Sequence, residues 1–163
     1  MSDTNAPKHL EELLTGFDNA MLVTRRPDGR MRSRPMAIVD VRGDGTIYFA
    51  TAIDSPKTEE LEGDPHVNVA LQSGGRFVSI TGTGRIVADR ALLDRLWSES
   101  WRVWFPGGPD DPSLCLLVVD PEEAEFWDRS GGRGLKYLFQ AAKAYLSGTQ
   151  PPPDEEQRGK VKT

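Results

Sequence analysis

The stretch that decides the fold is GTIYFATAIDSPKTEEL, which runs from Gly45 to Leu61. Its apolar first part, Thr46 to Thr51, predicts a buried strand that a short polar turn separates from a helix. The helix is expected to begin at Ser55-Pro56-Lys57, because serine suits the position before a helix and proline the first helical position. A helix start presents unpaired N–H groups and the positive end of the dipole, and Lys57 adds a full charge. Together these features predict a phosphate site.

The triplet at residues 55–57 also fits an ordinary helix cap with a solvated lysine, and alone it favours that interpretation. The phosphate interpretation gains from the hydroxyl of Thr51 and from an arginine-rich strand that we expect to pair beside it. Arg30, Arg32 and Arg34 alternate with other residues, so they point to one face of that strand. Arg34 lies in mid-strand before an apolar run, and it therefore needs an anionic partner or a route to solvent.

Outward from this stretch, short apolar or alternating segments separated by glycine-containing turns predict a series of strands. The expected strands are residues 20–25, 31–41, 46–51, 67–72, 76–87, 114–120 and 124–128. Pro35 predicts a bulge or an unpaired edge, and Gly82 and Gly84 inside a strand predict a sharp bend or close backbone approach. With few helices, this pattern predicts a mainly β (α+β) protein with a small closed antiparallel barrel of six to seven strands.

Apolar residues at helical spacing predict helices over residues 7–17, 56–62, 90–103 and 135–146. In the third, Leu93, Trp97, Trp101 and Trp104 recur on one face, and we interpret Trp97 and Trp101 as core residues. Residues 1–148 are expected to form a single domain, and the polar, proline-rich tail over 149–163 is expected to be disordered.

Composition narrows the class of protein. A net charge of −5 over 163 residues argues against general nucleic-acid binding, and no apolar run approaches the roughly 20 residues of a membrane-spanning helix. One cysteine and two histidines exclude an internal disulfide and a His-rich metal site, so we expect a soluble cytoplasmic protein without structural metal. Five arginines cluster between Arg25 and Arg34, and those near the turn are interpreted as solvated. Such a local positive excess suggests a small anionic ligand.

No pair of nucleophile and base is evident. His9 and His66 lie in poor contexts for catalysis, and Cys115 lies in an apolar run that predicts an inert, buried thiol. The acidic pairs at residues 59–60 and 110–111 are expected to be solvated. Trp104, Phe105 and Trp127 could reach a flat aromatic ligand or a partner subunit, and residues 101–106 could form an interface strip. If the protein is an enzyme, a cofactor must carry the chemistry.

A series of motifs then resembles the pyridoxamine-phosphate-oxidase-like FMN-binding split barrels, and within them the small bacterial general stress proteins. The motifs are SRPM (33–36), IYFATxxxSxK (47–57), EL (60–61), DPxVNV (64–69), ITGTG (80–84), WFPxGxDDP (104–112) and EFWD (125–128). No single motif is decisive, but their order over residues 8 to 130 is specific.

The resemblance implies a six-stranded split barrel with flanking helices, working as a homodimer with FMN at the subunit interface. Arg34, Pro35 and Met36 would line the flavin and its ribityl chain. Phe49, Ala50 and Thr51 would meet the ring and the phosphate, which Ser55 and Lys57 would hold. Trp127, and Trp104 with Phe105, would cover the flavin from the same or the partner chain.

Within this resemblance, Pro56 stands where pyridoxamine phosphate oxidases usually carry an arginine, and their C-terminal Trp and Arg elements have no counterpart. These departures argue against the pyridoxamine phosphate reaction itself. The first hypothesis is a stress-associated, flavin-dependent oxidoreductase of unknown substrate. The alternatives are a flavin-binding stress or sensor protein without turnover, and a deazaflavin-binding reductase on the same fold, whose longer anionic tail the arginines could serve. Haem is disfavoured because both histidines are poorly placed.

Overall fold

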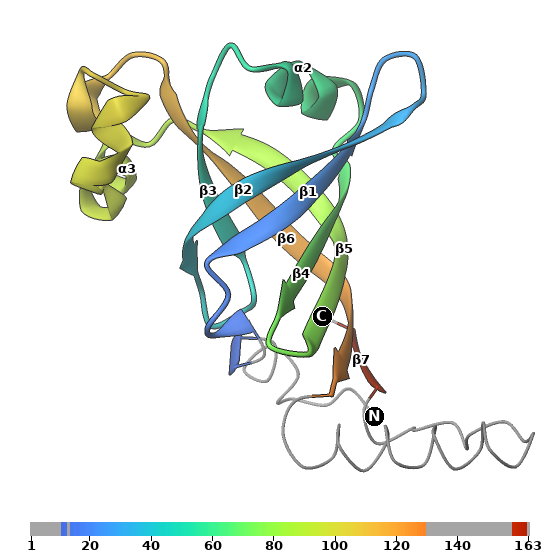
Figure 1. Ribbon diagram of the computed structural model, residues 1–163. Helices are drawn as coiled ribbons and strands as arrows, with labels where there is room; N and C mark the ends of the chain where they lie inside the picture. The colour runs from blue at the N-terminus through green and yellow to red at the C-terminus, as the bar shows by residue number, and fades with distance from the viewer. Residues whose placement is uncertain (1–10, 13, 130–157, 163) are drawn as a thin grey trace, which may run out of the picture.

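The computed structural model describes residues 11–12, 14–129 and 158–162, the last segment as backbone only. Six antiparallel strands close into a barrel in the order β3-β2-β1-β4-β5-β6, because β3 also pairs with β6 (Figure 1). The strands are β1 (Asn19–Arg25), β2 (Met31–Val41), β3 (Ile47–Ala52), β4 (His66–Ser73), β5 (Arg76–Val87) and β6 (Leu114–Asp128). The closed, mainly β barrel predicted from the sequence is confirmed.

Two apolar cores explain the pattern of the strands. Ile47 and Phe49 of β3 point into the barrel, whereas Tyr48 between them packs on the outside against a second cluster. Strand β6 divides in the same way, with Leu117 inside the barrel and Leu116 outside. Both strands are therefore buried on two faces, which is why their sequences are continuously apolar rather than alternating.

The helices cover different parts of the barrel (Figure 1). Helix α2 (Pro56–Gly63) lies across one end, while α3 (Arg90–Leu96) and two 3-10 turns, η1 (Glu99–Val103) and η2 (Gly108–Asp110), lie to one side over the second core. Of the first expected helix, residues 11, 12 and 14 are helical, and its earlier residues lie outside the described ones. Within the described part of the chain, no helix combines the length and the apolar character needed to cross a membrane.

The helix predicted over residues 90–103 is wrong in its second half. Helix α3 ends at Leu96, Trp97 is extended (φ −53°, ψ 135°), and the chain then tightens into η1. The rings of Trp97 and Trp101 pack edge to face with centroids 5.6 Å apart, and both are partly buried against the second core instead of lying within it. Trp104 leaves this face and is 71% exposed. In a continuous helix, Trp104 would lie on the same face as Trp97 and Trp101. Because the helix ends at Leu96, only Trp97 and Trp101 pack on the second core.

The end of the chain also differs from expectation. The two strands predicted over 114–120 and 124–128 form the single strand β6, which stays extended through Pro121. Residues Arg158–Lys162, expected to be disordered, form β7 along the edge of β6, which otherwise presents unpaired backbone groups. The rest of the tail and the helix expected over 135–146 lie outside the described residues.

Pro35 and the strand glycines act at different points of the barrel. Pro35 pairs with Met21 of β1, and β3 joins β2 only from Ile38, so Pro35 lies on an edge. The register shift of β2 falls after Ile38 instead of at the proline. The close backbone approach expected at the strand glycines is confirmed at Gly82, beside the carbonyl group of Asp120, whereas Gly84 lies under α2, where an added Cβ would come within 2.9 Å of the side-chain atom Leu61 Cδ2.

We expect Gly82→Ala to destabilise the barrel by about 1–3 kcal/mol, because overpacking at a tight site forces the backbone to shift. A Cβ at Gly82 would lie 2.2 Å from the carbonyl oxygen of Asp120, at the bulge where β5 meets β6. Gly63→Ala is the matched control, because nothing lies within 4 Å of its added Cβ. Urea unfolding of the two variants measures the difference, and equal stability would contradict the role assigned to Gly82.

Candidate functional site

Three hydroxyl groups gather where β3 meets α2. The Oγ of Ser55 lies 3.5 Å from Thr51 Oγ1 and 3.3 Å from Thr58 Oγ1. Ser55 precedes the helix as expected, but its hydroxyl caps no backbone N–H, and it joins the other hydroxyls instead. Thr58 also donates to the carbonyl oxygen of Ala52 at 3.3 Å. The helix start is thus left without a side-chain cap, and several polar groups lie beside it.

Lys57 adds a positive charge to these hydroxyls. It is half-buried and makes no hydrogen bond or ion pair with any residue that the structure describes. Burial lowers the pKa of the Lys57 ammonium, and the nearby positive charge of Arg34 lowers it further. Two cations are therefore held near one another, and a phosphate would compensate both.

Arg34 is fixed by a buried carboxylate on α2. Its Nη2 lies 2.6 Å from Glu60 Oε2, and its Nη1 donates to Thr24 Oγ1 at 2.6 Å. Arg32 Nη1 lies 3.0 Å from the other oxygen of Glu60. The anionic partner required for Arg34 is thus a protein carboxylate. Glu60 is only 4% exposed and Asp111 only 8%, so the expectation that these two residues are solvated is wrong.

The protonation of Glu60 is set by opposing effects. Burial, the largest effect, raises the pKa of this carboxyl group, but the hydrogen bond from Thr24 and the charges of Arg34 and Arg32 together lower it below its usual 4.5. Since the pKa in the folded state is below that in the unfolded state, the carboxylate stabilises the fold above pH 4.5. This contribution is lost as the pH falls through the folded-state pKa.

We therefore expect Glu60→Gln to flatten the acid side of the stability profile. The free energy of unfolding of the unsubstituted protein should decrease below pH 4.5 more steeply than that of the variant. Urea unfolding of both proteins at a series of pH values measures this difference. Parallel profiles would show that the ionisation of Glu60 does not contribute to stability.

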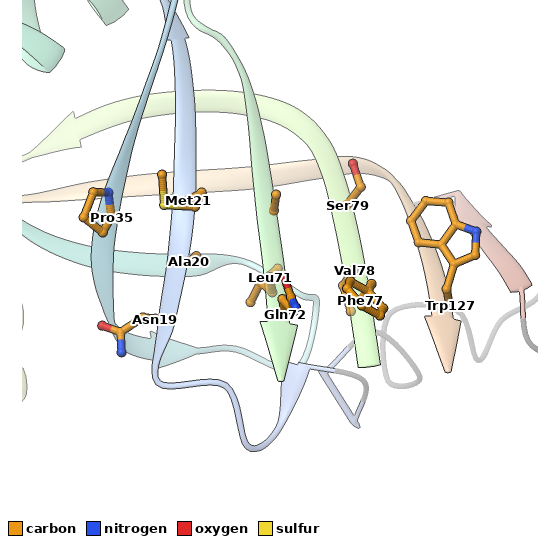
Figure 2. A pocket seen from close by; sticks show the side chains of 11 residues that line it. Asn19, Ala20, Met21, Pro35, Leu71, Gln72, Phe77, Val78, Ser79 and Trp127 are labelled. Atoms are coloured by element: carbon orange, nitrogen blue, oxygen red, sulfur yellow. The ribbon is translucent and has the colours of Figure 1, made fainter. Parts of the chain in front are cut away.

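A shallow apolar groove of about 440 Å³ lies elsewhere, on the outer face of the barrel (Figure 2). Figure 2 shows its side chains on β1, β2, β4, β5 and β6. Met21 and Phe77 are 41% and 36% exposed, which is high for large apolar residues in a sheet. Of the residues predicted for the site, Pro35 and Trp127 line this groove.

The structure separates the predicted site residues into groups. Thr51, Ser55 and Lys57 lie at the start of α2, and Arg34 contacts Glu60 further along that helix, whereas Pro35 and Trp127 lie in the groove. Met36 and Phe49 are buried in the barrel core, with Ala50 on the opposite face of β3. Phe105 is buried in the second core beside the exposed Trp104. The residues predicted to hold the phosphate and Trp127, which was predicted to cover the flavin, thus lie in different parts of the barrel.

Cys115 and His66 belong to chemically reactive residue types, but neither has the surroundings of a catalytic residue. Cys115 is fully buried, and burial raises the pKa of its thiol to about 11, which agrees with the predicted inert thiol. His66 is exposed and its Nδ1 lies 2.7 Å from Asp64 Oδ1. Neither residue is arranged as a nucleophile with a base.

Several site residues escaped sequence reasoning. Thr58 follows Ser55 by one helical turn, so its place beside Ser55 could have been predicted from helix geometry. Glu60 precedes Leu61, the large apolar residue of α2, but consecutive helical residues do not share a face, so this neighbour does not indicate the burial of Glu60. Met21, Gln72 and Phe77 line the groove, but outward-facing residues of alternating strands carry no signal that distinguishes a groove from a solvated face.

The fold agrees with the comparisons to known proteins. The sequence model of the family described as pyridoxamine 5'-phosphate oxidase like matches residues 5–152, and the chain belongs to this family. General stress protein 26 of Bacillus subtilis is 35% identical over 83 residues, covering 48% of this chain and 59% of that protein. The match spans less than two thirds of that relative.

Two solved structures show the same architecture. The general stress FMN/FAD binding protein of Xanthomonas citri is 32% identical, with a TM-score of 0.65 over 78% of this chain and 90% of that one. The general stress protein 26 of Bacillus anthracis has a TM-score of 0.66 at 24% identity over 76% of this chain and 94% of that one. The second likeness concerns the fold alone.

Proposed function

We propose that this protein binds FMN and holds the phosphate of the flavin at the start of α2. The observation that carries the proposal is Lys57, a half-buried cation without a partner among the described residues, close to the charge of Arg34. The hydroxyls of Thr51, Ser55 and Thr58 lie beside it as further donors. The FMN/FAD binding protein of Xanthomonas citri, on the same fold, supports a flavin as the ligand.

The charge of the cluster fits the terminal phosphate of FMN. A phosphate monoester carries about −1.5 to −2 charges near neutral pH and offers three acceptor oxygens. Lys57 supplies one full positive charge, and Arg34 supplies donors, although Glu60 offsets part of its charge. We therefore favour FMN over deazaflavin or FAD, because one terminal phosphate group matches the cationic and hydroxyl donors at the start of α2.

We further propose a homodimer in which a second copy covers the apolar groove and completes the flavin site. The groove residues Met21, Pro35, Phe77 and Trp127 offer an apolar surface that suits the centre of an interface. Trp127 is remote from Lys57 in the fold, since it lies in the groove while Lys57 begins the helix across the opposite end (Figure 1). Aromatic cover for a flavin held at α2 is therefore supplied more readily by another subunit.

For the activity, we propose a cytoplasmic flavin-dependent oxidoreductase of unknown substrate. Bound FMN supplies hydride and electron transfer, and the chain's own residues bind the cofactor and orient it. The inert thiol of Cys115 and the surface pair of His66 with Asp64 fit a protein that leaves the chemistry to its cofactor. A flavin-binding stress or sensor protein without turnover would use the same site.

The mass of the cofactor that purifies with the protein tests this proposal. We expect released FMN, and stopped-flow reduction by a nicotinamide donor followed by reoxidation with an added acceptor would establish turnover. Release of a deazaflavin, or failure to bind added FMN, would contradict the proposed ligand. Bound FMN that no donor reduces would favour the sensor.

A further inference from the structure

Glu60 has no direct part in the proposed flavin site, yet it is the most buried carboxylate at that end of the barrel. It is 4% exposed and lies on α2, one turn after Lys57. Its partners come from two strands: Thr24 from β1, and Arg32 and Arg34 from β2. Glu60 thus connects α2, whose start forms the proposed phosphate site, to β2, which carries Arg34.

The contacts of Glu60, Thr24 and Arg34 form a closed triangle. Thr24 donates to Glu60 Oε2 at 2.5 Å, while Arg34 donates from Nη2 to the same oxygen and from Nη1 to Thr24, each at 2.6 Å. Thr24 is fully buried, so both partners of the guanidinium are rigidly placed. A guanidinium has five N–H donors, and these contacts leave three of them for a ligand.

From this geometry we infer that Glu60 is a positioning residue that holds Arg34 beside Lys57 for the cofactor phosphate. The inference rests on the proposed function. Without the carboxylate, a largely buried arginine next to another cation would move toward solvent, since an unpaired buried charge is costly. The second oxygen of Glu60 binds Arg32 at 3.0 Å, which keeps the carboxylate oriented toward β2.

A purely structural role is the competing explanation, in which Glu60 only fastens α2 to the barrel. The two explanations differ in what the loss of Glu60 does to two ligands that differ by the phosphate. A positioning residue acts on FMN and spares riboflavin, whereas a displaced helix would weaken both.

The experiment is a double-mutant cycle read out as affinity for FMN and for riboflavin. We expect Glu60→Gln to weaken FMN about tenfold, within the range of coupled neighbouring groups, and to leave riboflavin unchanged. In an Arg34→Met background, Glu60→Gln should cause no further loss, because it acts through Arg34. Glu59→Gln is the matched control: this neighbouring residue is exposed, carries the same charge and is expected to leave both affinities unchanged.

Thr24→Val is the second variant, should Glu60→Gln fail to fold, because it removes the other contact of Arg34 and keeps the carboxylate. It should also weaken FMN selectively. Unchanged or tighter FMN binding by Glu60→Gln, equal losses for both ligands, or losses that add to that of Arg34→Met would overturn the inference. If the unsubstituted protein binds no FMN, the proposed function itself fails; if Lys57→Ala weakens FMN and Glu60→Gln does not, only the role of Glu60 is overturned.

Discussion

Lys57→Ala is expected to weaken FMN binding about 10- to 100-fold, the effect of losing a hydrogen bond to a charged group. Riboflavin, which lacks the phosphate, should bind the variant as tightly as it binds the unsubstituted protein. The reason is that Lys57 is half-buried beside the hydroxyls of Thr51 and Ser55 and makes no ion pair with the described residues that its loss would break. Fluorescence titration with the two flavins measures both affinities.

Arg95→Ala is the control for this change in charge. Arg95 is an exposed cation on α3, and its removal lowers the net charge by the same amount away from the start of α2. It should leave FMN affinity within about twofold, because Arg95 is exposed on a different helix and salt screens exposed charges. Equal losses of FMN and riboflavin in Lys57→Ala would mean that Lys57 does not contact the phosphate.

Met21→Asp is expected to convert the proposed dimer into monomers at micromolar concentration. Met21 lies on β1 opposite Pro35, in the groove that we propose a second copy covers. In a two-fold interface each substitution occurs twice, so two carboxylates would lose water without a partner. Sedimentation velocity measures the change, and FMN affinity should fall with it if, as we propose, the second subunit completes the site.

Val103→Asp distinguishes the groove from the other exposed apolar surface. Val103 and Trp104 are 80% and 71% exposed and belong to the strip over residues 101–106 that the sequence suggested as an interface. If the groove is the interface, Val103→Asp should remain dimeric. Monomers from Val103→Asp together with an intact Met21→Asp dimer would contradict the assignment of the groove.

Much of the barrel could be predicted because local sequence patterns mark its strands and turns. The turns before β2 and β3 and the alternation in β4 gave strands within a residue or two of the observed ends. Helix α3 and strand β6 were misjudged for tertiary reasons. Trp97 takes an extended conformation so that its ring packs edge to face on Trp101, and Pro121 stays within β6 because it lies opposite Gly82 at a bulge.

The site could be predicted only where its residues lie close together in the sequence. Ser55, Thr51 and Lys57 belong to one strand-turn-helix unit, so their proximity followed from the sequence. Glu60 could not be paired with Arg34 in this way, because the contact depends on how α2 lies across the end of the barrel. The burial of Phe105 likewise depends on a second core that the sequence did not reveal.

The central claim, that the FMN phosphate lies among Lys57, Arg34 and the hydroxyls beside the start of α2, is tested most directly by phosphorus NMR of FMN on the protein. Free phosphate monoesters take up a proton with a pKa of about 6. A phosphate held by two cations should stay dianionic, so we expect the resonance of bound FMN to be constant between about pH 5 and 8. A bound resonance that titrates near pH 6, like that of free FMN, would contradict the claim.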